Sequence, residues 1–283
     1  MNKEKMELIK CDVEAALGIK TEIKHVLKNG MDCWGLSPMT NDAVKPVVYY
    51  DGESNNASYI AKVKELFAQS LPGGNSITSS ITSSLMNPSY ILQHTRVCVQ
   101  RKSSENILKR QILNLEAYMR LDLSPVIGHT DSLASTKITN TILMMAGLTS
   151  DDLWTAADKN TRQSMDINSI DQLLSINDPL LPNLFDVITT RDRLFGASAL
   201  RYPDVFRQYC LAHNTDKLLI IPSSIHELLI IDAKEMVMDY AAMAQMVADV
   251  NAAEVTESEQ LDPVVYMYSV DTDIVSIVAS AIR

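Results

Sequence analysis

Two short apolar runs in the C-terminal half constrain the fold of this chain more than any other feature. Residues 217–221 (KLLII) and 228–231 (LLII) have the length of buried strands, and the corner 222–227 (PSSIHE) separates them. Antiparallel pairing through a hairpin is the economical solution, because parallel strands need a much longer crossover connection. The C-terminal half is therefore predicted to contain an antiparallel sheet.

The other segments of the C-terminal half favour an α+β fold. Strands are predicted at 185–190, 196–200 and 264–268, and helices from Thr149 to about 161, from Pro203 onward and over about 235–253. Thr149 with Asp152 resembles a capping box, and Pro203 fits the first turn of a helix. The predicted order is strand, strand, helix, strand, strand, helix, strand, a mostly antiparallel sheet packed against helices.

The N-terminal third predicts a helix, a β-hairpin, a strand at 47–50 and a second helix. Asn29 and Gly30 lie between two extended runs, which is the strongest short-range signal for a hairpin. Apolar residues at helical spacing predict helices over 3–17 and around 59–67. These elements define a predicted N-terminal subdomain over 1–72.

Residues 73–84 (GGNSITSSITSS) form a low-complexity stretch that divides the chain. Gly, Ser and Thr offer little apolar surface to offset the entropy of ordering, so we expect a mobile loop or linker there. A C-terminal α+β domain is predicted over 85–283. Its first part favours a strand at 96–100 and a polar helix over 103–115, whereas 138–145 fits a strand or a helix.

Charge and cysteine usage limit the partners of this acidic chain. The 25 basic residues face 35 acidic ones, and the net charge of −10 opposes binding to nucleic acid and to anionic membranes. No window approaches the roughly 18 apolar residues that span a bilayer. The four cysteines lie far apart and lack zinc-ligand spacing, so we expect reduced thiols, a cytoplasmic location, no metal and no cofactor.

Four ordered blocks carry a resemblance to a known family. They are 153–161 (LWTAADKNT), 185–206 (FDVITTRDRLFGASALRYPDVF), 217–230 (KLLIIPSSIHELLI) and 246–268 (MVADVNAAEVTESEQLDPVVYMY). In combination they resemble an uncharacterised bacterial domain-of-unknown-function family, number 5688, of gut anaerobes. The chain departs from the family pattern at 146–148, where a Trp is missing, and at Asn214, where many members have Gly. The resemblance implies a fold, but no activity, cofactor or catalytic residue.

The corner between the two apolar runs holds the candidate catalytic residues Ser224 and His226. Histidine can act as a base near neutral pH, and Ser224 and Glu227 lie close to it in the sequence. In an extended segment Ser224 and His226 share a face while Glu227 points away, so this acid would not orient the imidazole as a triad requires. The favoured interpretation is structural, with Ser223, Ser224 and His226 capping backbone groups at a tight hairpin.

Binding at the same corner is a further hypothesis. Ser223, Ser224 and His226 would then form a surface with Arg191 and Arg193, which follow the predicted strand at 185–190. The nearby glycine, Gly196, lacks the spacing of a phosphate-binding loop. We expect it instead to allow a close backbone approach beside Phe195.

No nucleophile, base, metal ligand or phosphate loop converges at a recognisable spacing in this sequence. We therefore predict a non-catalytic protein-binding module, whose partner is another protein. Two alternatives stay open: a hydrolase-like enzyme in which His226 works with Ser224 or a distant acid, and a small-ligand sensor enclosed between the subdomains. The sequence leaves the oligomeric state undetermined.

Overall fold

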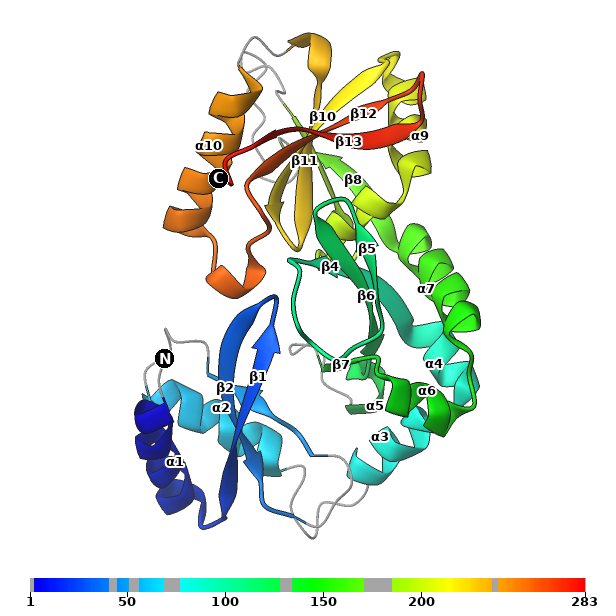
Figure 1. Cartoon of the computed structure of the whole chain (residues 1–283). Coiled ribbons are helices and arrows are strands. Elements are labelled where there is room, and N and C mark those ends of the chain that lie inside the picture. The colour runs from blue at the N-terminus through cyan, green and yellow to red at the C-terminus, as the bar shows by residue number, and fades with distance from the viewer. Residues whose placement is uncertain are drawn as a thin grey trace.

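The fold is α+β with antiparallel strand pairing, as predicted, and the described strands form three sheets. The computed structural model describes residues 3–40, 45–50, 56–68, 77–127, 134–170, 185–235 and 239–282. Every strand pair within these ranges is antiparallel. Figure 1 shows the three sheets one above another along the long axis of the molecule, with the N-terminal sheet at the bottom.

The N-terminal part has the predicted order of helix, hairpin, strand and helix. Its elements are α1 (Lys3–Leu17), β1 (Thr21–Lys28), β2 (Met31–Pro38), β3 (Val48–Tyr49) and α2 (Asn56–Ala68). Asn29 and Gly30 form the turn between β1 and β2 with φ values of 49° and 76°, which is the conformation that makes Asn-Gly a favoured hairpin turn. One face of the sheet packs on the two helices around a core of its own, which includes Leu36, Tyr59 and Phe67.

The central part is built around the long strand β6. Its elements are α3 (Ile77–Leu85), α4 (Pro88–His94), β4 (Thr95–Gln100), β5 (Lys109–Ile112), β6 (Leu115–Asp122), α5 (Ser124–Ile127), β7 (Ser135–Lys137), α6 (Asn140–Ala146) and α7 (Ser150–Ser164). Strand β4 pairs with one edge of β6, and β5 and β7 pair with successive parts of the other edge.

Several predictions for this part are confirmed and two need correction. The strand at 96–100 and the Thr149 cap of α7 are confirmed, and 138–145 is largely helical. The predicted helix over 103–115 is wrong, because pairing with β6 makes 109–112 a strand despite its polar residues. The expected loop is a helix from Ile77 onward, whereas 73–76 lie outside the described residues.

The C-terminal part contains the largest sheet, with the strand order β13-β12-β10-β11-β9-β8. Its elements are β8 (Met165–Ser169), β9 (Asp186–Thr190), η1 (Gly196–Arg201), α9 (Pro203–His213), β10 (Lys217–Ser224), β11 (Glu227–Asp232), η2 (Ala233–Glu235), α10 (Tyr240–Glu254), η3 (Glu257–Glu259), β12 (Val264–Ser269) and β13 (Ile274–Ser280). The hairpin of β10 and β11, from which the sheet was predicted, is confirmed, and β13 adds an edge strand that we did not predict.

One predicted strand of the C-terminal part, 196–200, is wrong. Residues 196–201 form the 3₁₀ helix η1, in which the first five residues are buried. A Cβ atom on Gly196 would lie 2.3 Å from Thr189 Cα and 2.7 Å from His226 O, so only glycine fits between β9 and the β10–β11 turn. The predicted close approach at Gly196 is therefore confirmed, and it leaves η1 as a compact turn.

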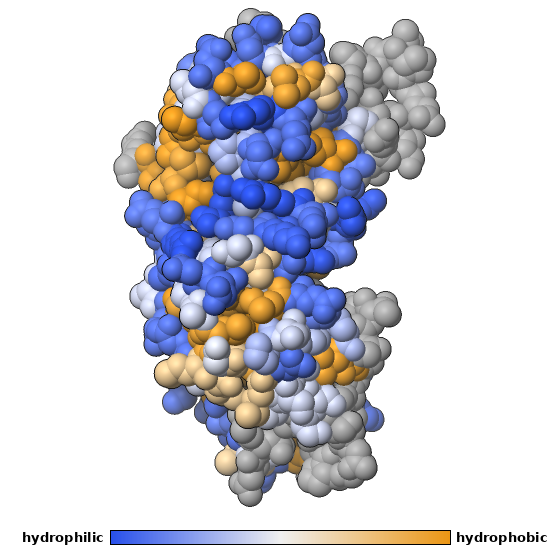
Figure 2. All heavy atoms as spheres, turned by 90° about the vertical axis from the view of Figure 1, so that its right-hand side faces the viewer, coloured by the Kyte–Doolittle hydropathy of each residue, from blue (hydrophilic) through white to orange (hydrophobic). Residues whose placement is uncertain are grey.

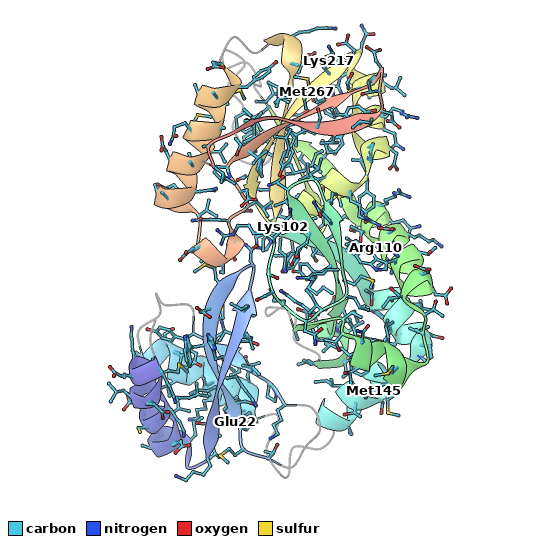
Figure 3. All side chains as sticks on the ribbon, viewed as in Figure 1. Glu22, Lys102, Arg110, Met145, Lys217 and Met267 are labelled. Atoms are coloured by element: carbon cyan, nitrogen blue, oxygen red, sulfur yellow. The ribbon has the colours of Figure 1, made fainter. Side chains whose placement is uncertain are left out.

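Asn29 attaches the N-terminal hairpin to the other two parts of the molecule. Its side-chain Nδ2 donates to Ser258 O (3.1 Å) and Gln260 O (2.7 Å), and its Oδ1 accepts from the backbone N–H of Arg101 (2.7 Å). Figure 3 labels Lys102 beside this hairpin tip, at the boundary between the blue and green parts of the chain. The tip of β1–β2 is thus fixed where the three sheets meet.

Candidate functional site

A cavity of about 620 Å³ lies where the three sheets meet. Its walls come from β1 and β3 of the N-terminal part, from β4, β6 and β7 of the central part, and from three C-terminal segments: the loop at 194–195, the β10–β11 turn at 225–226 and η3. The central wall is polar because β6 alternates strictly. Leu115, Ala117, Met119 and Leu121 join the main core, whereas Tyr118 and Arg120 point to the opposite side and line the cavity.

Three cations form one row across the central sheet, and two of them, Arg120 and Lys137, line the cavity. The strand register places Arg120 of β6 opposite Arg96 of β4 on one side and Lys137 of β7 on the other. Arg96 Nη1 lies 2.5 Å from Asp192 Oδ2, and Lys137 Nζ lies 2.5 Å from Glu105 Oε2. The two outer cations are therefore neutralised, whereas no carboxylate in the described ranges pairs with the middle one.

Arg120 interacts with the Cys98 thiol, but part of its hydrogen-bonding capacity is left unused by the described residues. Its residue is 7 % exposed, and neither Nε nor Nη1 has a hydrogen-bond partner among the described residues. The guanidinium carbon lies 4.3 Å from the centre of the Phe195 ring, a cation–π contact that holds the group without neutralising it. A buried guanidinium in this state is costly unless an acceptor approaches it.

Lys28 brings a second cation to the cavity from the N-terminal wall. Its Nζ lies 3.5 Å from the centre of the Tyr49 ring, and Tyr49 also lines the cavity. Burial, helped by the nearby Lys137 and Lys62, lowers the pKa of Lys28 to about 8, although Cys33 and Glu105 oppose the shift. No ion pair joins Lys28 to a carboxylate within the residues that the structure describes.

The rest of the polar wall is a satisfied network. Lys137 Nζ donates to Gln100 Oε1 (2.8 Å) as well as to Glu105, and it lies 4.6 Å from the centre of the Tyr118 ring. Burial raises the pKa of Tyr118 well above its usual range, so its hydroxyl keeps its proton at neutral pH. In this part of the wall the charges of Lys137 and Glu105 therefore offset each other.

His226 lines the third wall of the cavity and is held by a strained loop. Phe195 has φ 61°, a left-handed conformation that is uncommon for an aromatic residue. Its backbone N–H donates to His226 Nδ1 (3.2 Å), and Gly196 N–H donates to His226 O (2.8 Å). Because Nδ1 accepts a hydrogen bond, the neutral ring carries its proton on Nε2, which faces Glu259 Oε1 at 3.5 Å.

The serines of the corner do not join His226 in the cavity. Ser224 Oγ accepts from the backbone N–H of His226 (3.0 Å), and Ser223 Oγ donates to Glu227 Oε1 (2.9 Å). Neither serine is among the residues that line the cavity. Ser224 therefore caps a backbone N–H of the turn, whereas Ser223 bonds to a side chain instead of a backbone group. The acid beside His226 is the distant Glu259 rather than Glu227.

The two arginines proposed as binding residues lie elsewhere. Arg191 and Arg193 are exposed and do not line the cavity. Arg193 has φ 57°, and its backbone N–H donates to Thr190 O, so it shapes the loop that presents Phe195. Of the candidates from the sequence, the structure brings His226 alone to the cavity.

None of the sequence motifs includes the cations of the site, although the strand that carries Arg120 has a recognisable local pattern. In 115–122 (LEAYMRLD) a charged or aromatic polar residue alternates with an apolar one over the full length of a strand. That alternation predicts a strand with one polar face. It does not predict that the polar face is covered, because Lys28 and His226 arrive from remote parts of the chain.

The described residues contain neither a metal-holding cluster nor a membrane-spanning helix. They contain no group of three or more His, Cys, Asp or Glu side chains placed to hold a metal ion. None of their helices combines the length and the apolar character that crossing a bilayer requires. Among the four free thiols, Cys98 and Cys210 are buried, and burial raises the pKa of both.

Comparison with known proteins identifies a family but no function. Curated proteins and solved structures give no match to this chain. A family profile described as "Family of unknown function (DUF5688)" matches residues 6–270, a span that includes all the residues of the cavity. The chain belongs to this family of unknown function.

Proposed function

We propose that the protein binds a small anionic molecule in the cavity where its three sheets meet. The observation that carries this proposal is Arg120, a buried guanidinium with two nitrogens that lack an acceptor among the described residues. Carboxylates and phosphates match the planar donor fork of arginine. This is the small-ligand sensor that the sequence left open as an alternative.

The surroundings of Arg120 support binding rather than a purely structural role. The two cations opposite it on β4 and β7 already have carboxylate partners, so these partners are not shared with Arg120. Like charges directly opposite on a sheet destabilise it. An anion delivered by a ligand would neutralise the middle of the row and fill the free donors.

Equilibrium binding of small anions tests this proposal. Calorimetry with inorganic phosphate and with a series of small carboxylates should detect at least one anion that binds to the wild-type protein. Arg120→Met should weaken that binding roughly 10- to 100-fold, because a hydrogen bond to a charged group contributes about 1.5–3 kcal/mol.

Arg110→Met provides the matched control. Arg110 lies on β5 of the same sheet but reaches towards α7, where it pairs with Asp151 (2.8 Å), as its position in Figure 3 shows. Its replacement should leave anion binding unchanged. Absence of binding by the wild-type protein, or equal binding by the Arg120 and Arg110 variants, would overturn the proposal.

Catalysis on the bound anion is a second candidate, and the pair of His226 and Glu259 favours it. The ring lines the cavity, and its Nε2 faces the carboxylate at 3.5 Å. A proton on Nε2 suits a hydrogen-bond donor or general acid, with Glu259 as the partner that orients it. His226→Gln would then abolish turnover of the bound anion without abolishing its binding. Unchanged turnover would show that His226 takes no part in the reaction.

The protein-binding role predicted from the sequence has one surface that favours it, the edge strand β13. Ile274 and Ile277 on this strand are 58 % and 45 % exposed, and exposed edges pair readily with other strands. Figure 2 shows that hydrophobic patches on the side of α7 and α9 are separated by a hydrophilic band. A partner would therefore be sought at β13, and Ile277→Lys should abolish its capture.

A further inference from the structure

We infer that the molecule bound in the cavity carries two anionic groups, one held by Arg120 of the central sheet and the other by Lys28 of the N-terminal hairpin. The inference rests on the proposed function and defines its ligand more narrowly. The class is a dicarboxylate or a phosphorylated carboxylic acid, since both present two anions on one small skeleton.

The charges that line the cavity leave two cations free for a ligand. Lys28, Arg120 and Lys137 are the cationic side chains of its walls, and Glu105 and Glu259 are the anionic ones. Lys137 pairs with Glu105, and Glu259 faces His226. Within the described residues, the remaining cations, Lys28 and Arg120, have no carboxylate partner.

Aromatic rings keep both free cations in place without satisfying them. Lys28 lies over Tyr49 at 3.5 Å, and Arg120 lies over Phe195 at 4.3 Å from the ring centres. A ring face attracts a cation weakly and competes little with an anion. The two cations are therefore positioned before a ligand arrives, which reduces the entropy lost on binding.

The size of the cavity suits a ligand that spans its walls. Small-molecule sites commonly enclose about 300–1,000 Å³, and the volume of about 620 Å³ lies within that range. Because Lys28 and Arg120 come from different sheets, a two-anion ligand would join the N-terminal hairpin to the central sheet. Such a ligand would stabilise the docked position of the hairpin against the central sheet.

Pairs of acids that differ by one carboxylate test the inference. We would measure the affinities of the dicarboxylates from malonate to pimelate and of the monocarboxylates of equal chain length, and would add 3-phosphonopropionate as the phosphorus-containing arm. At least one of these two-anion probes should bind roughly 10-fold or more tightly than its monoanionic counterpart, as a second charge-assisted contact predicts.

Substitutions at Lys28 assign the second anion. Lys28→Met should erase the advantage of the dicarboxylate while leaving monocarboxylate binding unchanged, and Lys28→Arg should retain most of it. Lys24→Met is the matched control, because Lys24 lies on the same strand, pairs with Glu22 and does not line the cavity. Circular dichroism checks that each variant is folded.

The outcomes separate this inference from the proposed function. Equal affinity for dicarboxylates and monocarboxylates, with both lost in Arg120→Met, would overturn the inference and leave the anion site standing. A dicarboxylate preference that survives Lys28→Met would overturn the assignment of Lys28. If none of the acids binds, or if binding persists in Arg120→Met, the proposed function fails together with the inference.

Discussion

Met119 and Arg120 are consecutive residues of β6, and both are nearly inaccessible to solvent, but their environments differ. Met119 is fully buried among apolar side chains of the main core, where its side chain needs no hydrogen-bond partner. Arg120 faces a polar cavity, and two of its donor nitrogens have no partner in the part of the chain that the structure describes. Burial on one face stabilises the fold, whereas burial on the other face leaves a charged group without an acceptor from those residues. The following predictions test that difference.

The largest effect on stability is expected on the apolar face. Met119→Ala should lower the free energy of unfolding by about 2–5 kcal/mol, because it removes buried contacts and leaves a cavity. Chemical denaturation measures this change. The anion affinity of the protein that remains folded should stay within twofold of wild type, and a large loss of affinity would show that the two faces are not independent.

An intermediate effect is expected at the hairpin tip. Asn29→Gly keeps a turn that tolerates positive φ but removes three hydrogen bonds, so it should lower the free energy of unfolding by about 1–3 kcal/mol. Hydrogen exchange should rise at β1 and β2. Asn29→Asp keeps the acceptor for the backbone N–H of Arg101, so hydrogen exchange at the Arg101 amide should rise less in this variant. An unchanged exchange pattern in both variants would refute the docking role of Asn29.

A small effect of opposite sign is expected on the cavity face. Arg120→Met removes a buried charge that lies between two other cations and has no carboxylate partner within the described ranges. The free energy of unfolding of the ligand-free variant should therefore be unchanged or higher by about 1 kcal/mol. Thermal and chemical denaturation without added anions measure it. Destabilisation by several kcal/mol would mean that Arg120 is a structural residue after all.

The pH dependence gives the finest test of the cavity face. Burial holds the pKa of Lys28 at about 8, below its ordinary value of 10.5, with Lys137 and Lys62 favouring the neutral amine, and Cys33 and Glu105 the ammonium. Since an anion needs the ammonium form, dicarboxylate affinity should fall about tenfold between about pH 7 and pH 9. Monocarboxylate affinity and the Lys28→Met variant should show no such fall.

The same pKa difference affects stability with a defined sign. Between about pH 8 and 10.5 the unfolded chain keeps the proton of Lys28 that the folded chain has released. The unfolded state therefore binds more protons, and the free energy of unfolding should rise with pH across this window. The Lys28→Met variant lacks this contribution and serves as the reference. If the free energy of unfolding of the wild-type protein decreased with pH relative to this variant, the buried position of the Lys28 amine would be contradicted.

Local signals in the sequence were sufficient for much of the fold. The Asn29–Gly30 turn, the Thr149 cap and the β10–β11 hairpin each depend on neighbouring residues, and all three are present. The strand at 109–112 could not be predicted, because its extended conformation comes from pairing with β6 and its own residues are polar. The 3₁₀ helix at 196–201 could not be predicted, because it depends on the close contact of Gly196 with the β10–β11 turn, which is distant in the sequence.

The candidate site depended on long-range placement, so only part of it could be predicted. His226 attracted attention because serine and glutamate flank it, yet its partner in space is Glu259. Lys28 is an ordinary residue beside a turn, and Arg120 is an ordinary charged residue of an alternating strand. Their importance arises from the packing of three sheets around one cavity, and no spacing in the sequence records that packing.

The docking of Asn29 on Ser258 and Gln260 has a consequence for how the protein is made. During synthesis the hairpin emerges from the ribosome early, but the carbonyl groups that receive it are translated more than two hundred residues later. The cavity can thus be completed only after nearly the whole chain has left the exit tunnel. Acquisition of anion binding by stalled nascent chains of increasing length should be abrupt and late, which makes it a reporter of completed folding.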